Sequence, residues 1–180
     1  SKDTLVIVIS QSGETADTIA AMREAKNQGL KVLAITNVKG STISREADAV
    51  IYTQAGMEIS VASTKAYITQ LLVIYLLAIR IAQIKGQISE SKASELLAEL
   101  KAIPEKAKQL LDSKESVQRF AARRFRDKST FFIGRGMDYA LAMEASLKLK
   151  EVSYVHSEAY AAGELKHGTI ALIEDNTLVV

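Results

Sequence analysis

The sequence contains no cysteine among its 180 residues. This absence excludes a thiol nucleophile, a disulfide framework and cysteine-ligated zinc, and it fits a reducing compartment. Histidine is also scarce. The chain has two, His156 and His167, which are too few and too far apart in sequence for a histidine-rich metal centre. We therefore expect a functional site that needs neither a metal nor a cofactor.

A large charge imbalance is missing as well. The 23 basic and 21 acidic residues leave a net charge of +2, so no overall field favours nucleic acid or an anionic membrane. No signal peptide is visible, which predicts a cytoplasmic protein. The longest apolar run, Leu71 to Ile79, has about half the length that a membrane span needs, and it predicts a buried helix instead.

Runs of β-branched apolar residues alternate with stretches of helical periodicity, which is typical of an α/β protein with parallel strands. The predicted strands are Thr4–Ser10, Lys31–Thr36, Ala47–Tyr52, Ser129–Gly134 and Asp175–Val180. The predicted helices are Ala16–Gln28, Ser63–Lys85, Glu90–Asp112, Ser116–Arg126 and Met137–Val152. We expect a three-layer αβα architecture, in which helices cover both faces of a parallel sheet and the first strand is covered on both faces.

The chain is expected to form two lobes, residues 1–88 and 128–180, joined by a helical block at residues 89–127. The ending Asn176–Val180 repeats the apolar pattern of Asp3–Val8. This similarity predicts two lobes that each begin at the same strand, both of them incomplete in this chain.

A loop rich in hydroxyl groups follows the first strand. It contains Ser10, Gln11, Ser12, Gly13 and Thr15. In a parallel sheet this position lies beside a helix N-terminus, where amide groups and the helix dipole favour an anion. The loop lacks the lysine of a nucleotide-binding P-loop, so a phosphomonoester fits better. Simple helix capping by Ser12 or Thr15 is the alternative.

A second hydroxyl cluster, Val61–Tyr67, also precedes a predicted helix. Here Ser63 or Thr64 is expected to cap the helix.

Three charged residues lie close together on the predicted helix Met137–Val152. At about 100° per residue, Glu144, Lys148 and Glu151 fall within roughly 60° of one another. Leu147 lies on one side of them, and Leu141 and Val152 lie on the other. We expect these charges to be partly buried on the apolar side of the helix, where their pKa values would suit proton transfer. The alternative is an exposed ladder of salt bridges.

Further along, His167 lies in the glycine-containing segment His156–Gly168. Its imidazole is a candidate general acid or base. A histidine that merely faces solvent is the alternative.

Taken together, five segments resemble the sugar isomerase (SIS) domains of the glucosamine-6-phosphate synthase family. They are Ser10–Thr18, Val61–Tyr67, Gly134–Gly136, Ser146–Tyr154 and Glu158–Gly168. The resemblance implies flavodoxin-like lobes and an isomerase half that works on fructose 6-phosphate and glucosamine 6-phosphate.

Residue roles follow from the same resemblance. It implies that Ser10, Gln11, Ser12 and Thr15 bind the sugar phosphate, and that Val61 and Ser63 approach the sugar.

It further implies that Glu151 transfers a proton between C1 and C2, that Lys148 assists and that Glu144 supports the site. His167 is implied to open the sugar ring, reaching into a neighbouring subunit of a homodimer.

The resemblance also implies parts that this chain lacks. These are a glutaminase domain that releases ammonia, the first strand of the first lobe, and a C-terminal tail whose lysine forms an imine. The chain alone is therefore not expected to be active. A sugar-phosphate sensor and a fructosamine-6-phosphate deglycase or deaminase remain alternatives. A sensor of transcription would carry a basic recognition helix, which is not visible here.

Overall fold

The computed structural model describes residues 3–124, 126, 127, 129–175 and 177–180. Its internal contacts divide the chain into two compact units, Ser1–Pro104 and Glu105–Val180. Each unit contains a three-stranded parallel sheet flanked by helices, so the predicted α/β class is confirmed. Some predicted elements and lobes include residues outside the described part of the chain, namely Ser1, Lys2, Phe125, Lys128 and Asn176.

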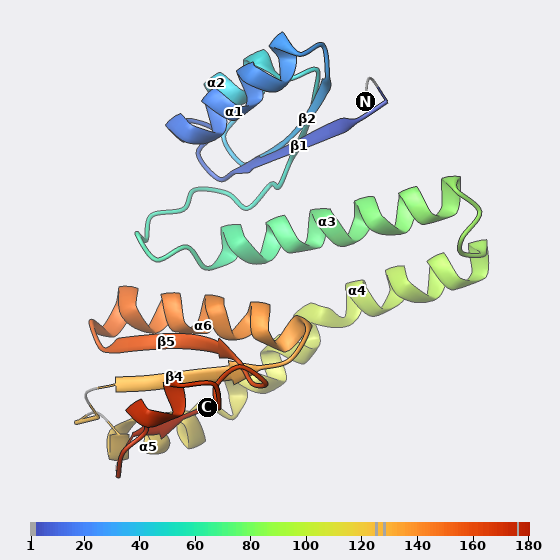
Figure 1. Ribbon diagram of the computed structural model, residues 1–180. Coiled ribbons are helices and arrows are strands. Elements are labelled where there is room, and N and C mark those ends of the chain that lie inside the picture. Colours follow the sequence, from blue (N-terminus) through green and yellow to red (C-terminus); the bar gives the residue numbers. More distant parts are fainter. Residues whose placement is uncertain (1–2, 125, 128, 176) are drawn as a thin grey trace. The chain divides into compact units, whose positions relative to one another are not determined.

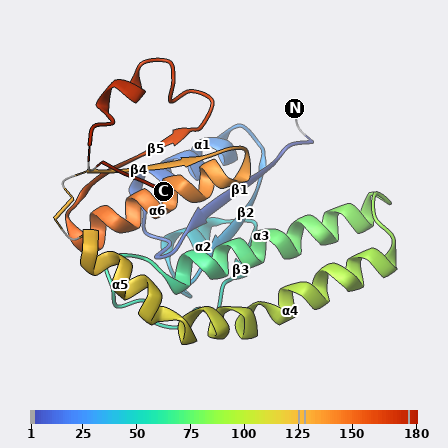
Figure 2. The same cartoon turned by 90° about the horizontal axis from the view of Figure 1, so that it is seen from below.

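The first unit has its sheet between two layers of helix (Figure 1). In order across the sheet, its strands are β1 (Leu5–Ser10), β2 (Lys31–Thr36) and β3 (Ala49–Tyr52). Its helices are α1 (Ala16–Asn27), α2 (Thr42–Glu46), α3 (Lys65–Ile84) and the first part of α4 (Glu90–Asp112). The short strand β3 is labelled in the second view (Figure 2).

One face of this sheet forms the core with α1 and α2. Val8 and Val32 point to this face, where they pack with Met22 of α1 and Ile43 of α2, and the last two are fully buried. Burying a side chain of this size stabilises a fold by about 1.5–3 kcal/mol. This cluster therefore fixes both helices against the sheet, at the strand ends from which the hydroxyl loop emerges.

The opposite face is covered less completely than the sequence predicts. Ile7 and Ile9 of β1 are 44% and 40% exposed, although Ile35 of β2 is fully buried. A cavity of about 300 Å³ lies between these strands and the α3 residues Ile74 and Ile81. The expectation that β1 is covered on both faces is therefore wrong, because β1 is the edge strand of this sheet and α3 leaves a gap beside it.

Helix α3 is also not the buried helix that its composition predicts. Only Ala66 and Val73 are buried, while Ile68 and Ile84 are more than half exposed. By length and composition α3 is able to cross a membrane, with a mean hydropathy of 1.7, but the core helix of a soluble protein meets the same criteria. The apolar composition of α3 therefore does not predict how much of the helix is buried.

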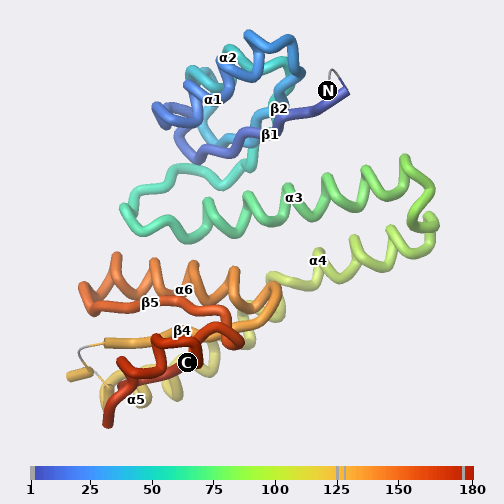
Figure 3. The backbone as a smooth tube through the Cα atoms, viewed as in Figure 1, coloured from blue at the N-terminus to red at the C-terminus, as the bar shows by residue number. Residues whose placement is uncertain are grey.

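Beyond α3 the chain reverses into α4, which runs through Pro104 to Asp112 and contains the boundary of the two units (Figure 3). The second unit continues with α5 (Lys114–Arg124), β4 (Ser129–Gly134), α6 (Met137–Ser153), β5 (His156–Ala161), the 3₁₀ helix η1 (Thr169–Leu172) and β6 (Leu178–Val179). Its strand order is β5-β4-β6.

Acid is expected to destabilise the first unit through its carboxylates. A backbone hydrogen bond from Thr42 lowers the pKa of Glu14, and one from Val32 lowers the pKa of Asp48. A carboxylate with a lowered pKa stabilises the fold above its unfolded pKa, and this contribution is lost as the pH falls through the folded pKa. Urea unfolding followed by circular dichroism should therefore show a falling midpoint below about pH 4.5.

In the same experiment Glu14→Gln should flatten the dependence on pH. The exposed Glu95→Gln on α4 is the control and should leave it unchanged. A Glu14→Gln profile parallel to that of the wild type would contradict this account.

Candidate functional site

The hydroxyl loop joins β1 to α1 and is internally cross-linked. The hydroxyls of Ser10 and Thr15 are 2.8 Å apart, and Ser10 Oγ accepts a hydrogen bond of 3.0 Å from the Gly13 amide. Ser12 Oγ accepts from the Glu14 amide at 3.2 Å. These bonds hold Ser10, Ser12 and Thr15 around the glycine, as the predicted anion loop requires.

Gly13 is placed where no other residue fits well. Its φ is +68°, in the left-handed region, and a Cβ there would lie 2.1 Å from Ser41 Oγ and 3.0 Å from Thr36 Oγ1. The Gly13 carbonyl accepts from the Ile43 amide at 3.0 Å, so α2 packs directly behind the loop. The sequence signals a turn at this glycine, whereas the close approach of Ser41 is a feature of the tertiary structure.

Helix capping does not explain these hydroxyls. Thr15 occupies the N-cap position of α1, yet its side chain makes no capping hydrogen bond and pairs with Ser10 instead. The first intrahelical bond runs from the Ile19 amide to the Thr15 carbonyl at 2.9 Å, so the amides of residues 16–18 have no partner within the helix and lie at the positive end of the helix dipole. This combination suits a phosphate group.

The second hydroxyl cluster lies in the long connection between β3 and α3. Val61 is 97% exposed there. The expected capping by Ser63 or Thr64 is wrong, because Thr64 is the N-cap residue but its side chain makes no capping bond. Glu58 Oε2 accepts from the Ala66 amide at 3.1 Å instead. A carboxylate eight residues upstream thus serves the helix N-terminus, which the sequence pattern did not signal.

In the second unit, α6 carries the charged trio as predicted. Lys148 Nζ lies 2.5 Å from Glu151 Oε2 and 3.6 Å from Glu144 Oε1. The side chains of Lys148, Glu144 and Glu151 are 24%, 19% and 28% exposed. The expected partial burial is therefore confirmed, and the trio is less exposed than an ordinary surface salt-bridge ladder.

The side of α6 on which the trio lies differs from the prediction. Ala142 and Ser146 are the buried residues of α6, and Ser146 Oγ lies 3.1 Å from Ser157 Oγ of β5. At 3.6 residues per turn the trio lies roughly 140–160° around the helix from Ser146, so it points away from the sheet of its own unit. The apolar Leu141 and Val152 share this outer side and are 63% and 65% exposed. The expectation that these apolar residues mark the inward side of α6 is wrong.

Electrostatics keep the Lys148 side chain cationic. Its hydrogen bond with Glu151, with a further contribution from the charge of Glu144, raises the pKa of Lys148. The site therefore presents one ammonium group between the side chains of Glu144 and Glu151. A carboxylate beside a fixed cation is a suitable arrangement for moving a proton next to a developing negative charge.

His167 lies in a series of turns after β5. Its amide donates to the Glu164 carbonyl at 3.0 Å, and the Ile170 amide donates to the Leu165 carbonyl at 2.8 Å. The residue is exposed and precedes Gly168, which has a φ of +132°. Its imidazole is thus accessible to a ligand, while its main chain is held by local hydrogen bonds.

With this geometry described, comparison with known proteins assigns the family. The model of the SIS domain matches residues 1–80 and 125–180 of the chain. The chain belongs to the SIS domain family. The resemblance predicted from the five sequence segments is confirmed.

Individual relatives agree with this assignment. The chain is 62% identical over 176 residues to the glutamine–fructose-6-phosphate aminotransferase [isomerizing] of Caldanaerobacter subterraneus subsp. tengcongensis, and 60% identical over 179 residues to that of Clostridium tetani. These matches cover 98% and 99% of the chain. The chain spans 29% of the length of both relatives.

A solved structure is similar over almost the same range. It is the C-terminal domain of glucosamine-fructose-6-phosphate aminotransferase from Francisella tularensis, with a TM-score of 0.94 and 40% sequence identity. The match covers 97% of this chain and 49% of that one.

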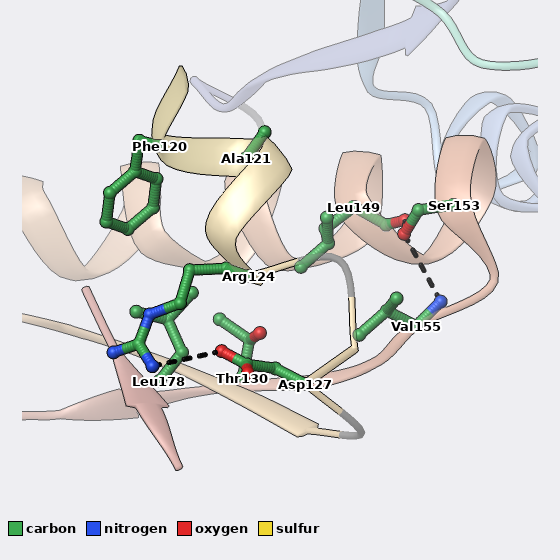
Figure 4. Close-up of a pocket in the computed structure, with 9 residues that line it drawn as sticks. All are labelled: Phe120, Ala121, Arg124, Asp127, Thr130, Leu149, Ser153, Val155 and Leu178. Carbon is green, nitrogen blue, oxygen red and sulfur yellow. Dashed lines mark hydrogen bonds and ion pairs between the residues drawn. The ribbon is translucent and has the colours of Figure 1, made fainter. Parts of the chain in front are cut away.

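The second SIS unit also contains an apolar cavity of about 430 Å³ that none of the predicted site residues lines (Figure 4). Phe120 of α5, Leu149 of α6 and Leu178 of β6 border it at the amino ends of the strands. Asp127 Oδ2 is buried there without a hydrogen bond, 3.6 Å from Arg124 Nη1. Ligands of parallel α/β sheets bind at the opposite, carboxyl ends, so we do not assign the candidate functional site to this cavity.

Proposed function

We propose that this SIS chain is the isomerase part of an enzyme that makes glucosamine 6-phosphate from fructose 6-phosphate and ammonia derived from glutamine. Ammonia condenses with the C2 carbonyl to give an imine and water leaves, and a proton transfer between C1 and C2 then completes the isomerisation. The single observation that carries this proposal is Lys148, whose ammonium is held 2.5 Å from the Glu151 carboxylate on the outer side of α6.

In the proposed mechanism Glu151 is the base. Its carboxylate takes the proton from C1 of the ketose imine and returns it to C2, or the reverse. The cation of Lys148 stabilises the enediol-like charge that develops on the adjacent oxygen, and Glu144 keeps Lys148 in position. Each step uses a side chain of this chain and requires no metal.

The remaining residues bind and prepare the substrate. Ser10, Gln11, Ser12 and Thr15 hold the 6-phosphate, supported by the outward amides at the start of α1.

Val61 and Ser63 approach the sugar. His167 opens the sugar ring by moving a proton between the ring oxygen and the anomeric hydroxyl.

We further propose that the chain acts within a longer cytoplasmic protein that also contains a glutaminase domain. The fraction of each curated relative that the chain covers supports this view. The chain on its own is then expected to be inactive.

Phosphate binding tests the proposal directly. In the longer protein, Ser12→Ala should weaken the binding of fructose 6-phosphate by roughly tenfold or more, because a hydrogen bond to a charged group contributes about 1.5–3 kcal/mol. Isothermal titration measures the effect, and fructose without phosphate should bind poorly to both proteins.

Ser91→Ala, an exposed change on α4, is the matched control and should bind like the wild type. If the wild-type protein bound neither fructose 6-phosphate nor glucosamine 6-phosphate, the proposed function would be wrong.

The longer protein is also expected to be a homodimer. The exposed apolar residues of α3, such as Ile68 at 59% and Ile84 at 70%, support burial against another surface. Light scattering should give twice the mass of one full-length chain, and a monomer at micromolar concentration would contradict this expectation.

Product analysis distinguishes the proposed enzyme from a related deglycase or deaminase. A deglycase or deaminase would release ammonia from an amino sugar phosphate, whereas the proposed enzyme forms glucosamine 6-phosphate when glutamine is supplied. A sugar-phosphate sensor would bind its ligand without exchanging the C1 or C2 protons with solvent.

A further inference from the structure

The connection from β3 to α3 follows a long irregular path (Figure 1). In the described part of the chain, residues 57–63 make no backbone–backbone hydrogen bond, and within this stretch only Ala62 is buried. Three of its apolar residues are more than three-quarters exposed, namely Met57, Ile59 and Val61. Regular structure and apolar packing therefore fix little of this path, so the side-chain bonds at its two ends carry more weight.

Asn37, the residue after β2, holds the beginning of the connection. Its Nδ2 donates a hydrogen bond of 2.7 Å to the Gly56 carbonyl. Its Oδ1 accepts two bonds, from Thr53 Oγ1 at 3.0 Å and from the Ala55 amide at 2.9 Å. Between them, Gln54 has a φ of +56°, in the left-handed region that residues other than glycine rarely adopt. The three bonds of Asn37 thus hold a turn that the sequence alone does not favour.

Glu58 holds the other end of the connection. Its Oε2 accepts a hydrogen bond of 3.1 Å from the Ala66 amide, in the first turn of α3. The positive end of the helix dipole favours a negative charge at this place. The bond joins residues eight positions apart and closes a loop, residues 58–66, that contains both Val61 and Ser63.

We propose that Glu58 is a positioning residue that closes this loop and thereby sets where Val61 and Ser63 stand relative to the sugar. Asn37 has the same role at the start of the connection. The inference rests on the proposed function, in which Val61 and Ser63 approach the sugar, and neither Glu58 nor Asn37 touches a reacting atom. A substrate displaced by about 1 Å from its catalytic group reacts much more slowly, so a bond at the base of this loop is able to affect proton transfer.

The test removes the carboxylate of Glu58 in the longer protein. Glu58→Ala should slow exchange of the C1 proton of saturating fructose 6-phosphate in deuterated water by roughly tenfold or more. Binding of ethyl phosphate, which carries a phosphate without a sugar, should stay within about twofold of the wild type, because residues 10–15 are unchanged.

Two further variants of glutamate residues complete this arm. Glu58→Gln keeps a side-chain oxygen that accepts from the Ala66 amide, so it should restore most of the rate of C1 exchange. Glu90→Ala is the matched control, because Glu90 is an exposed acidic residue in the first turn of another helix, α4. It should behave like the wild type towards both ligands.

Asn37 supplies a second and independent arm. Asn37→Ala removes all three side-chain bonds but keeps the main-chain amide, which donates to the Gln11 carbonyl of the phosphate loop at 3.1 Å. It should therefore also slow C1 exchange while ethyl phosphate binds as to the wild type. Asn37→Asp keeps the acceptor but loses the donor to the Gly56 carbonyl, so its rate should lie between those of Asn37→Ala and the wild type.

Hydrogen exchange reports on the connection without any substrate. The Ala66 amide should exchange faster in Glu58→Ala but not in Glu58→Gln, and the Ala55 amide should exchange faster in Asn37→Ala. The inference is overturned if Glu58→Ala exchanges the C1 proton at the wild-type rate, if Glu58→Gln is as impaired as Glu58→Ala, or if ethyl phosphate binding falls in parallel.

Failure of the proposed function is recognised separately. In that case the wild-type protein would not bind fructose 6-phosphate or exchange its C1 proton. Exchange of the Ala66 amide would still report whether Glu58 closes the loop.

Discussion

Replacing Glu151 by glutamine is expected to lower the rate of C1–C2 proton transfer by roughly 10²- to 10⁴-fold. The amide has nearly the same shape as the carboxylate but does not accept a proton near neutral pH. Lys148, now 3.6 Å from Glu144 as its remaining anionic partner, keeps its charge and its place on α6. Binding of fructose 6-phosphate should therefore change by only a few-fold while turnover collapses.

The measurement combines the rate of glucosamine 6-phosphate formation with exchange of the C1 proton in deuterated water. Glu144→Gln is the informative comparison and should have a smaller effect, because Lys148 Nζ is 3.6 Å from Glu144 but 2.5 Å from Glu151. Glu95→Gln, exposed on α4, should behave like the wild type. A Glu151→Gln protein with unimpaired proton exchange would remove Glu151 from its role as the base.

A methyl group at position 13 is expected to damage the phosphate loop more than any single hydroxyl deletion. In Gly13→Ala the new Cβ would lie 2.1 Å from Ser41 Oγ, and the alanine would have to adopt a φ of +68°. The backbone strain alone costs about 1–2 kcal/mol. Relief of the clash must move either the loop or the start of α2, and a displaced loop no longer holds the hydroxyls that we propose to bind the phosphate.

Gly40 offers a matched control within the same unit. Its φ is +74°, but a Cβ there has nothing within 4 Å, so Gly40→Ala reports the strain without the clash. Urea unfolding should place Gly13→Ala below Gly40→Ala in stability. Titration with fructose 6-phosphate should show a loss of roughly tenfold or more in affinity for Gly13→Ala alone. Equal behaviour of the two variants in both measurements would show that the Ser41 contact has no consequence.

Several elements around the candidate site were predictable because their signals are local. β1 is a continuous apolar run, α1 has helical spacing and ends before Gly29, and the hydroxyl loop between them contains a glycine. These patterns depend on residues a few positions apart, so they survive without knowledge of the fold.

Other elements have no such local signal. The segment that forms β5 contains His156 and Glu158 and reads as part of a polar loop, yet it pairs with β4 in parallel register from Ser129↔His156 onward. Its polar side chains are tolerated in a strand because Ser129 and Tyr160 bond to them. The five-residue helix α2 was missed because it is short and directly follows the turn-forming segment Asn37–Ser41.

Burial was the least predictable property. On α6 the sequence pattern favours the leucine side as the inner one, but small residues face the sheet because Ala142 and Ser146 allow close approach and Ser146 meets Ser157. On α3 the apolar composition correctly indicates a helix, but it does not say which of its sides are covered. Periodicity identifies an apolar side, whereas burial depends on what another part of the chain brings against it.

The sequence alone determined the α/β class, the family resemblance, the hydroxyl loop and the spacing that puts Glu144, Lys148 and Glu151 on one side of a helix. Only the tertiary structure decided that Ser41 lies against Gly13, that Glu58 serves the start of α3, and that Ser146 of α6 meets Ser157 of β5. The physical reason is the separation along the sequence over which each signal acts. Backbone periodicity and turn preference act between near neighbours, but each of these contacts joins residues 8 or more positions apart, which packing alone brings together.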